Sequence, residues 1–108
     1  MAFKPFNGNG TLNGTTEVTL VASPVVDVRR TVYRINIKNR NASAITVTLR
    51  YKDGASTREL QTVTLQVDDR LVWEGEEVLD DTNDSITAVL AAAPTTQPDF
   101  TVTYAERD

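Results

Sequence analysis

The sequence predicts an all-β fold: a single antiparallel β-sandwich, jelly-roll-like or immunoglobulin-like, with about seven or eight short strands. First, apolar and polar residues alternate with a period of two along several runs of the 108-residue chain, as in strands that have one solvated face. Second, Thr and Val are abundant, and their β-branched side chains pack well on a pleated surface. Third, Gly, Asn, Asp and Pro separate the runs, and no run has the length of a βαβ crossover helix.

The clearest pair of strands is expected at residues 31–38 and 45–52. In the first run Tyr33, Ile35 and Ile37 share one face, and this face is expected to point to the core. In the second run the apolar face, alternating with Thr, Arg and Lys, is made by Ile45, Val47, Leu49 and Tyr51. About five turn-type residues join the two runs, which predicts an antiparallel hairpin.

Further short strands are expected along the rest of the chain, at residues 16–21, 60–67, 71–73, 78–79, 86–92 and 100–104. Gly75 is expected to interrupt the chain between two of them, because glycine weakens the interior of a strand. The run 86–92 is rich in Ala and would also suit a helix. Its short length, between a turn and Pro94, favours a strand.

Residues 1–15 are predicted to form a flexible N-terminal arm, and residues 16–108 the β-sandwich domain. Asn-Gly and Gly-Asn steps fill the arm, and both residue types tolerate positive φ and disfavour regular structure. Phe3, Pro5 and Phe6 are apolar, so the arm is expected to dock onto a surface. Docking on its own domain and docking on a neighbouring subunit both remain open.

The chain contains no His and no Cys. This removes the commonest general base, the thiol nucleophile and zinc–thiolate sites, so we expect no enzyme, no catalytic residue, no metal and no cofactor. Asp80, Thr82 and Asp84 have the oxygen spacing of a calcium loop. Ser85 and Ala91 stand where an EF-hand loop requires Gly and Glu, so the segment is interpreted as a plain turn.

The formal net charge is −4, whereas a nucleic-acid-binding surface is normally basic. A local basic cluster between Arg29 and Arg40 does not reverse this balance, and we expect no nucleic-acid partner. No segment approaches the roughly 20 apolar residues that span a bilayer, and the first residues do not have the pattern of a signal peptide. We therefore expect no membrane partner.

Trp73 is the single Trp of the chain. It is interpreted either as an aromatic at the core or its rim, or as an interface anchor, because Trp is enriched in binding hot spots. With Phe3, Pro5 and Phe6 it completes the candidate interface residues.

Several segments together resemble small structural proteins of tailed bacteriophages, a group of minor virion, capsid decoration and tail-associated proteins. The resemblance spans residues 16–106 and rests on residues 33–49, 65–75, 78–80, 84–88 and 100–106. Within it, the run Leu71-Val-Trp73 is followed by Gly75, Val78-Leu79 and Asp84-Ser-Ile86. Asp80–Asp84 departs from the pattern, which has a glycine in this turn.

The resemblance implies a capsid decoration (cement) protein that stabilises the phage head by bridging capsid subunits. The implied partners are the major capsid protein, or other virion proteins, and the chain itself as a homotrimer. The implied location is the virion, assembled in the host cytoplasm. The alternatives are a neck or tail structural component and a carbohydrate- or receptor-binding β-sandwich.

Overall fold

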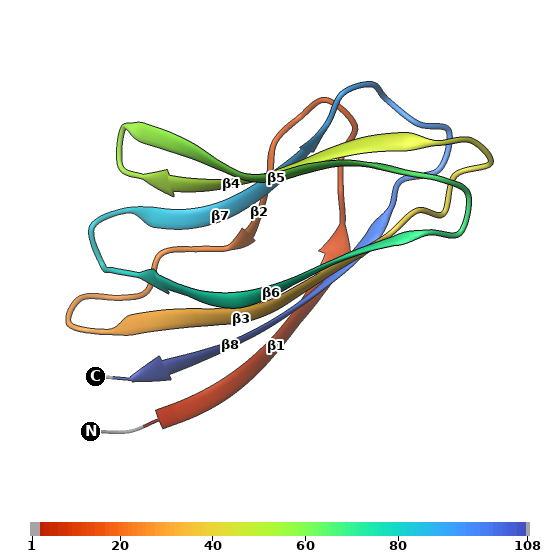
Figure 1. The fold of residues 1–108 in the computed structure, drawn as a ribbon. Helices are drawn as coiled ribbons and strands as arrows, with labels where there is room; N and C mark the ends of the chain where they lie inside the picture. The colour runs from red at the N-terminus through yellow and green to blue at the C-terminus, as the bar shows by residue number, and fades with distance from the viewer. Residues whose placement is uncertain (1–2, 108) are drawn as a thin grey trace.

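The structure, a computed structural model, describes residues 3–107 and contains eight strands and no helix in that range. In chain order the strands are β1 (Phe3–Thr11), β2 (Val18–Val21), β3 (Arg29–Lys38), β4 (Ile45–Asp53), β5 (Ser56–Leu65), β6 (Arg70–Leu79), β7 (Asp84–Leu90) and β8 (Asp99–Arg107). Figure 1 shows them as two packed layers. The predicted all-β sandwich is confirmed, and the ambiguous Ala-rich run forms strand β7.

The strands form two antiparallel sheets, a first sheet in the order β1-β8-β3-β6 and a second sheet in the order β2-β7-β4-β5. The pairing is nested, because β4 pairs with β5, β3 with β6, β2 with β7 and β1 with β8. An eight-stranded double sheet rolled up in this way is a jelly roll. An immunoglobulin-type sandwich has a different strand order. Both ends of the chain lie at one end of the sandwich (Figure 1).

The core lies between the two sheets and is built by the inward side chains of β2 to β8. Leu12, directly after β1, joins the same cluster. The apolar side chains with no exposed surface are Val32, Ile35, Ile37, Val47, Leu49, Leu79, Ile86 and Ala88. This arrangement follows from the alternation in the sequence, since successive side chains of a strand point to opposite faces.

The outer face of the second sheet is polar, as the alternation predicts. The hydroxyl groups of Thr46 and Thr64 lie 3.0 Å apart across β4 and β5. Beside them, Glu17 accepts hydrogen bonds from Lys52 Nζ at 2.7 Å and from Arg50 Nη1 at 3.2 Å. Cross-strand pairs of this kind favour one register of the sheet.

Tyr33 lies on a β-bulge, which corrects one part of the predicted core. The register of β3 shifts between Val32 and Arg34 against both neighbouring strands. Relative to β8, strand β3 has one extra residue at this point, and this residue reverses the alternation of the side chains that follow. Val32 and Ile35 therefore both face the core with no exposed surface, and Tyr33 is half-buried outside the core cluster. The placement of Tyr33 on the core face was wrong, whereas that of Ile35 and Ile37 is confirmed.

Gly75 lies inside a continuous strand and does not interrupt the chain as predicted. Strand β6 runs through it from Arg70 to Leu79. A Cβ atom on Gly75 would lie 3.1 Å from the Trp73 ring, which covers this position. The glycine therefore marks a place where a large side chain approaches the backbone closely.

Asn39 closes the end of the sandwich opposite the chain termini. Its side chain is fully buried, and Nδ2 donates to the carbonyl oxygens of Leu65, Gln66 and Ser43 at 3.0–3.1 Å. Its Oδ1 accepts the backbone N–H of Asn41 at 2.8 Å. One buried amide thus connects the β3–β4 loop to the β5–β6 turn, with its polar atoms satisfied.

Candidate interaction site

The segment 1–15, expected to be a flexible arm outside the sandwich, contributes strand β1 in the structure. Phe3–Thr11 pairs with β8 in an unbroken antiparallel register. Gly8 and Gly10 lie against Val102 and Phe100, and a Cβ atom on Gly10 would come within 2.9 Å of the Phe100 ring. The glycines that indicated a loop therefore permit close packing of two strands. Met1 and Ala2 of the expected arm lie outside the described residues.

The hydrogen bond made by Leu12, the residue just after β1, shows which N–H and C=O groups of β1 point towards β8. The N–H of Leu12 donates to the carbonyl oxygen of Pro98 at 3.0 Å, in register with the β1–β8 ladder. Because these directions alternate along a strand, the even-numbered residues of β1 point their N–H and C=O groups at β8. The odd-numbered residues point theirs away from the sheet. Pro5, which has no N–H, occupies one of these outward positions, as proline in an edge strand does.

Phe6 belongs to a half-buried aromatic and charged cluster on the inner face of the first sheet. Its ring stacks on Tyr104, with 5.3 Å between the ring centroids and 13° between the planes. The guanidinium carbon of Arg30 lies 5.2 Å from the centre of the Tyr104 ring, and Arg30 Nε donates to Glu106 at 2.6 Å. Stacking and cation–π contacts of this kind each contribute about 0.5–1.5 kcal/mol. Phe6 thereby attaches β1 to its own domain.

The other predicted interface residues of the arm point elsewhere. Pro5 is exposed and, one position from Phe6, lies on the outer face of the first sheet. The backbone of Phe3 begins β1, whereas its side chain lies outside the described part of the structure. The structure therefore places Phe6 and Pro5 on opposite faces of one strand.

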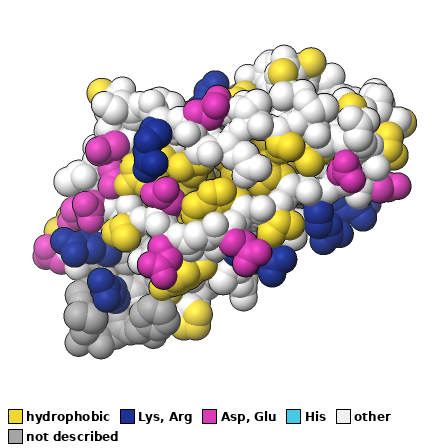
Figure 2. All heavy atoms as spheres, in the orientation of Figure 1, with side chains coloured by type: hydrophobic (Ala, Val, Ile, Leu, Met, Phe, Trp, Pro, Cys, Tyr) yellow, Lys and Arg dark blue, Asp and Glu magenta, His cyan; other side chains and the backbone are white. Residues whose placement is uncertain are grey.

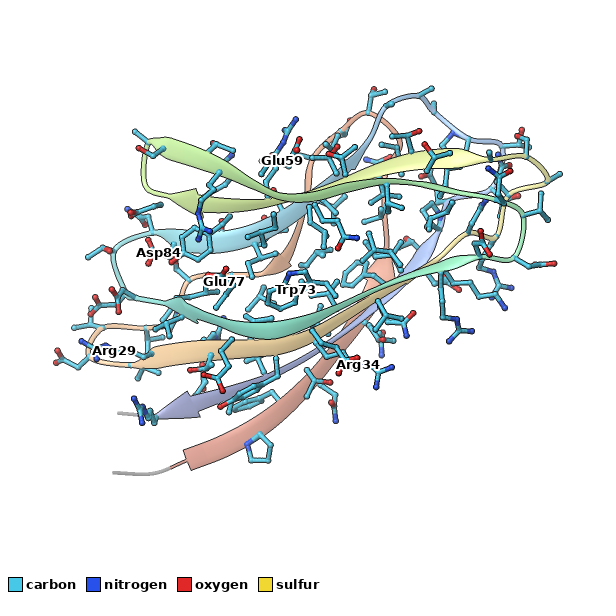
Figure 3. All side chains as sticks on the ribbon, viewed as in Figure 1. Arg29, Arg34, Glu59, Trp73, Glu77 and Asp84 are labelled. Carbon is cyan, nitrogen blue, oxygen red and sulfur yellow. The ribbon has the colours of Figure 1, made fainter. Side chains whose placement is uncertain are left out.

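Trp73 lies on β6, which is the opposite edge of the first sheet from β1. Its side chain is half-buried and packs on the core between the two sheets (Figure 3). Hydrophobic side chains reach the surface along this seam between the sheets (Figure 2). Trp73 is therefore a rim aromatic, and the structure does not bring it together with Phe6.

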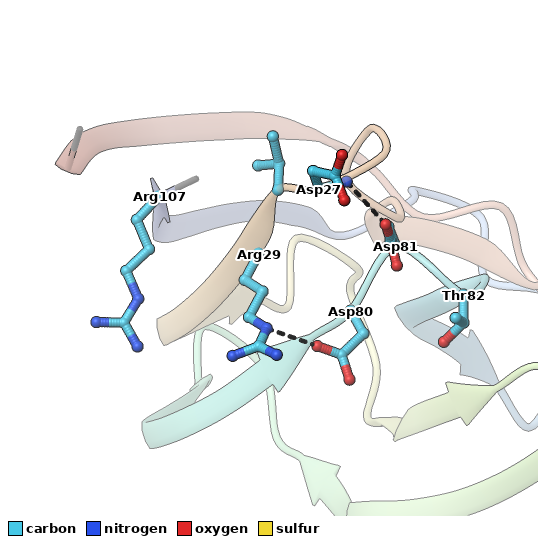
Figure 4. A pocket seen from close by; sticks show the side chains of 7 residues that line it. Asp27, Arg29, Asp80, Asp81, Thr82 and Arg107 are labelled. Atoms are coloured by element: carbon cyan, nitrogen blue, oxygen red, sulfur yellow. Dashed lines mark hydrogen bonds and ion pairs between the residues drawn. The ribbon is translucent and has the colours of Figure 1, made fainter. Parts of the chain in front are cut away.

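The end of the sandwich near the chain termini carries an open, charged hollow of about 480 Å³ (Figure 4). In it Arg29 Nε lies 3.2 Å from Asp80 Oδ1, and the backbone N–H of Asp27 donates to Asp81 Oδ2 at 2.8 Å. Both side chains of the Arg29–Asp80 ion pair are more than half exposed, so it contributes little to stability. The Asp27–Asp81 hydrogen bond connects the β2–β3 and β6–β7 loops. Six of the seven residues that line the hollow are charged or polar, whereas small-molecule pockets are mostly apolar.

The predicted turn at Asp80–Asp84 is organised by its last residue. Asp84 is buried, and its Oδ2 accepts the backbone N–H of Asp80 at 2.9 Å and lies 3.1 Å from the Tyr51 hydroxyl. Burial, together with Asp84, raises the pKa of Tyr51. A hydrogen bond with Asp84 and its negative charge raise the pKa of Asp53. Asp84 thus holds together the turn from Asp80 to Asp84 that the sequence predicted.

Metal binding and membrane insertion are two further properties on which the described residues bear. Within residues 3–107, no cluster of three or more acidic side chains is arranged to hold a metal ion. In the same range, no helix has the length and apolar character needed to cross a membrane. Sequence reasoning missed that Arg30 lies over the Tyr104 ring and pairs with Glu106, although the alternation from Phe100 to Tyr104 placed Tyr104 near the core.

No known protein-family model matches the chain, and no curated protein matches its sequence. Solved structures share its fold. A chain in the acid-stable capsid structure of Helicobacter pylori bacteriophage KHP30 has a TM-score of 0.60 at 14% identity, over 98% of this chain and 87% of that one. The Drosophila NLP core, in a structure concerned with pentamer formation and histone binding, has a TM-score of 0.57 at 10% identity, over 92% and 96%. A Bacillus endospore appendage, a disulfide-linked pilus, has a TM-score of 0.51 at 14% identity, over 96% and 85%. These matches establish the fold.

Proposed function

We propose that the chain is a structural subunit of a tailed-bacteriophage virion and not an enzyme. Its specific role would be that of a capsid decoration (cement) protein, which stabilises the head by bridging capsid subunits. The observation that carries this proposal is the match in fold, over 98% of the chain, with a chain from a bacteriophage capsid. Jelly rolls recur in viral capsid domains, and the sequence resemblance to small phage virion proteins points in the same direction.

The placement of the candidate residues supports a bridging role. Pro5 is exposed on β1, and half-buried Trp73 lies on β6, at the two opposite edges of the first sheet. A subunit that connects two neighbours needs contacts on two sides, and these two residues would offer apolar surface at both edges. The partners would be the major capsid protein and further copies of this chain, arranged as a homotrimer on a virion that assembles in the host cytoplasm.

The charge of the chain also agrees with a position on the outside of a particle. A net charge of −4 would be repelled by packaged DNA, whose phosphates favour basic surfaces. A neck or tail component would share every one of these features. Location on the particle is therefore the property to measure.

The test is immunogold electron microscopy of purified phage particles with antibodies raised against this chain. Labelling spread over the head is the expected result, and heads lacking the chain should release DNA at a lower temperature than complete heads. Labelling confined to the neck or tail would assign the chain there and reject the decoration role. Particles without any label would overturn the virion assignment.

A further inference from the structure

The four edge strands of the sandwich differ in how well they are protected against pairing with another chain. Natural edges are blocked by shortness, bulges, charges or proline. Strand β2 has 4 residues and a register shift. Strand β5 carries a bulge at Leu60 beside Arg58 and Glu59, and β6 contains four charged residues and faces a shifted register.

Strand β1 carries such protection only near its start, at Lys4 and Pro5. It has 9 residues, an unbroken register with β8, and one charged residue, Lys4. No strand within residues 3–107 pairs with its outer edge. The N–H and C=O groups of Asn7, Asn9 and Thr11 point away from the sheet along that edge, and their side chains are exposed and uncharged.

We propose that this outer edge of β1, from Asn7 to Thr11, pairs antiparallel with the same edge of a second copy of the chain. The pairing joins two first sheets into one continuous sheet across a two-fold axis. It rests on the geometry of β1 alone and does not depend on the proposed function. Because it is two-fold, it links subunits in pairs, whether these are single chains or members of two neighbouring trimers.

The edge is complementary to itself, which identifies a second copy as the occupant. Asn7 and Asn9 each offer one outward donor and one outward acceptor, the set that an identical antiparallel strand requires. Gly8 and Gly10 carry no side chain of their own on the inner face of the edge, so neither residue obstructs the approach of a second strand. Pro5 lacks an N–H group and limits the pairing to the second half of the strand.

A single strand edge is a small interface, so the expected dissociation constant lies in about the micromolar to millimolar range. Sedimentation velocity of the full chain, up to about millimolar concentration, should show a species of twice the starting mass. Asn9→Pro removes one outward N–H per copy and keeps the β1–β8 ladder. It should weaken association about tenfold or more, since the pair loses two hydrogen bonds.

Two further variants complete the design. Asn9→Lys leaves the backbone intact, brings like charges together across the axis and should also weaken association. Asn9→Ala keeps the backbone N–H and should associate like the natural chain. Hydrogen exchange should show protection of the Asn7 and Thr11 amides that grows with protein concentration.

The proposal is overturned if the natural chain stays at its starting mass at millimolar concentration. It is also overturned if Asn9→Pro and Asn9→Lys, confirmed as folded by circular dichroism, associate as tightly as Asn9→Ala. Association through a ring of three copies that depends on Asn9 would equally reject two-fold pairing. None of these results bears on where the chain sits on a phage particle, so the two proposals fail separately.

Discussion

Leu12 offers the most direct test of whether the first residues of the chain belong to the sandwich. It follows β1, is 2% exposed, and packs in the core cluster. Leu12→Ala keeps its backbone hydrogen bond to Pro98 but removes the buried isobutyl group. Such a truncation costs about 2–5 kcal/mol of unfolding free energy, and roughly 3 kcal/mol would lower the melting temperature of a domain of this size by roughly 12 °C.

Urea and thermal unfolding followed by circular dichroism would measure this loss. Val25→Ala is the matched control, because Val25 is 70% exposed in the β2–β3 loop and its truncation should change stability by less than about 0.5 kcal/mol. If Leu12→Ala proves as mild as Val25→Ala, residues 1–15 form an arm outside the core and the packing described for Leu12 is refuted.

Three further predictions concern buried polar and charged groups. Asn39→Ala should lower the unfolding free energy by about 2–4 kcal/mol, because it orphans carbonyl groups at one end of the core; a loss below 1 kcal/mol in urea titrations would mean that water replaces the amide. A hydrogen bond from Lys52 lowers the pKa of Glu17 below its ordinary value of 4.5, so its stabilisation is present above pH 4.5 and is lost as the pH falls through the lowered value. Glu17→Gln should therefore lower the melting temperature at pH 7, and this loss should shrink as the pH falls below 4.5; an equal loss at every pH would contradict this. Asp84 raises the pKa of Asp53 above 3.8, so the favourable contribution of Asp53 exists below pH 3.8 and disappears as the pH rises through the raised value. Asp53→Asn should accordingly raise the melting temperature at pH 7 but not at pH 3, and an unchanged melting temperature at pH 7 would count against the Asp53–Asp84 contact.

The alternation of apolar and polar residues in the sequence was sufficient to predict most strands of the sandwich and the faces that they bury. Ile35, Ile37, Val47 and Leu49 were placed on the buried face because a period of two fixes which side chains share a face. The face on which Tyr33 lies could not be predicted in this way, because a bulge depends on how two partner strands fit and leaves no local mark in the alternation. Strand order was equally hidden, because nested pairing is a property of contacts between distant segments.

Glycine produced the two largest differences between expectation and structure. In β1, Gly8 and Gly10 were interpreted as residues of a flexible arm, and in β6, Gly75 as a break. In both strands a neighbouring side chain, Phe100 or Trp73, fills the space that a Cβ would occupy. Local propensity cannot distinguish a glycine that permits a turn from one that permits close packing, since the difference lies in the partner.

The nested pairing also has a consequence for how the chain folds during its synthesis. The hairpin of β4 and β5 is local, whereas each outer layer, from β3 with β6 to β1 with β8, joins segments further apart. Contacts between distant segments are slow to form because loop closure must precede them. Among the strands of residues 3–107, β1 is the first to leave the ribosome, and β8, the strand that it pairs with, is the last. Strand β1 therefore stays without its partner while β2 to β7 are synthesised, and the nascent chain carries an unpaired strand until β8 emerges.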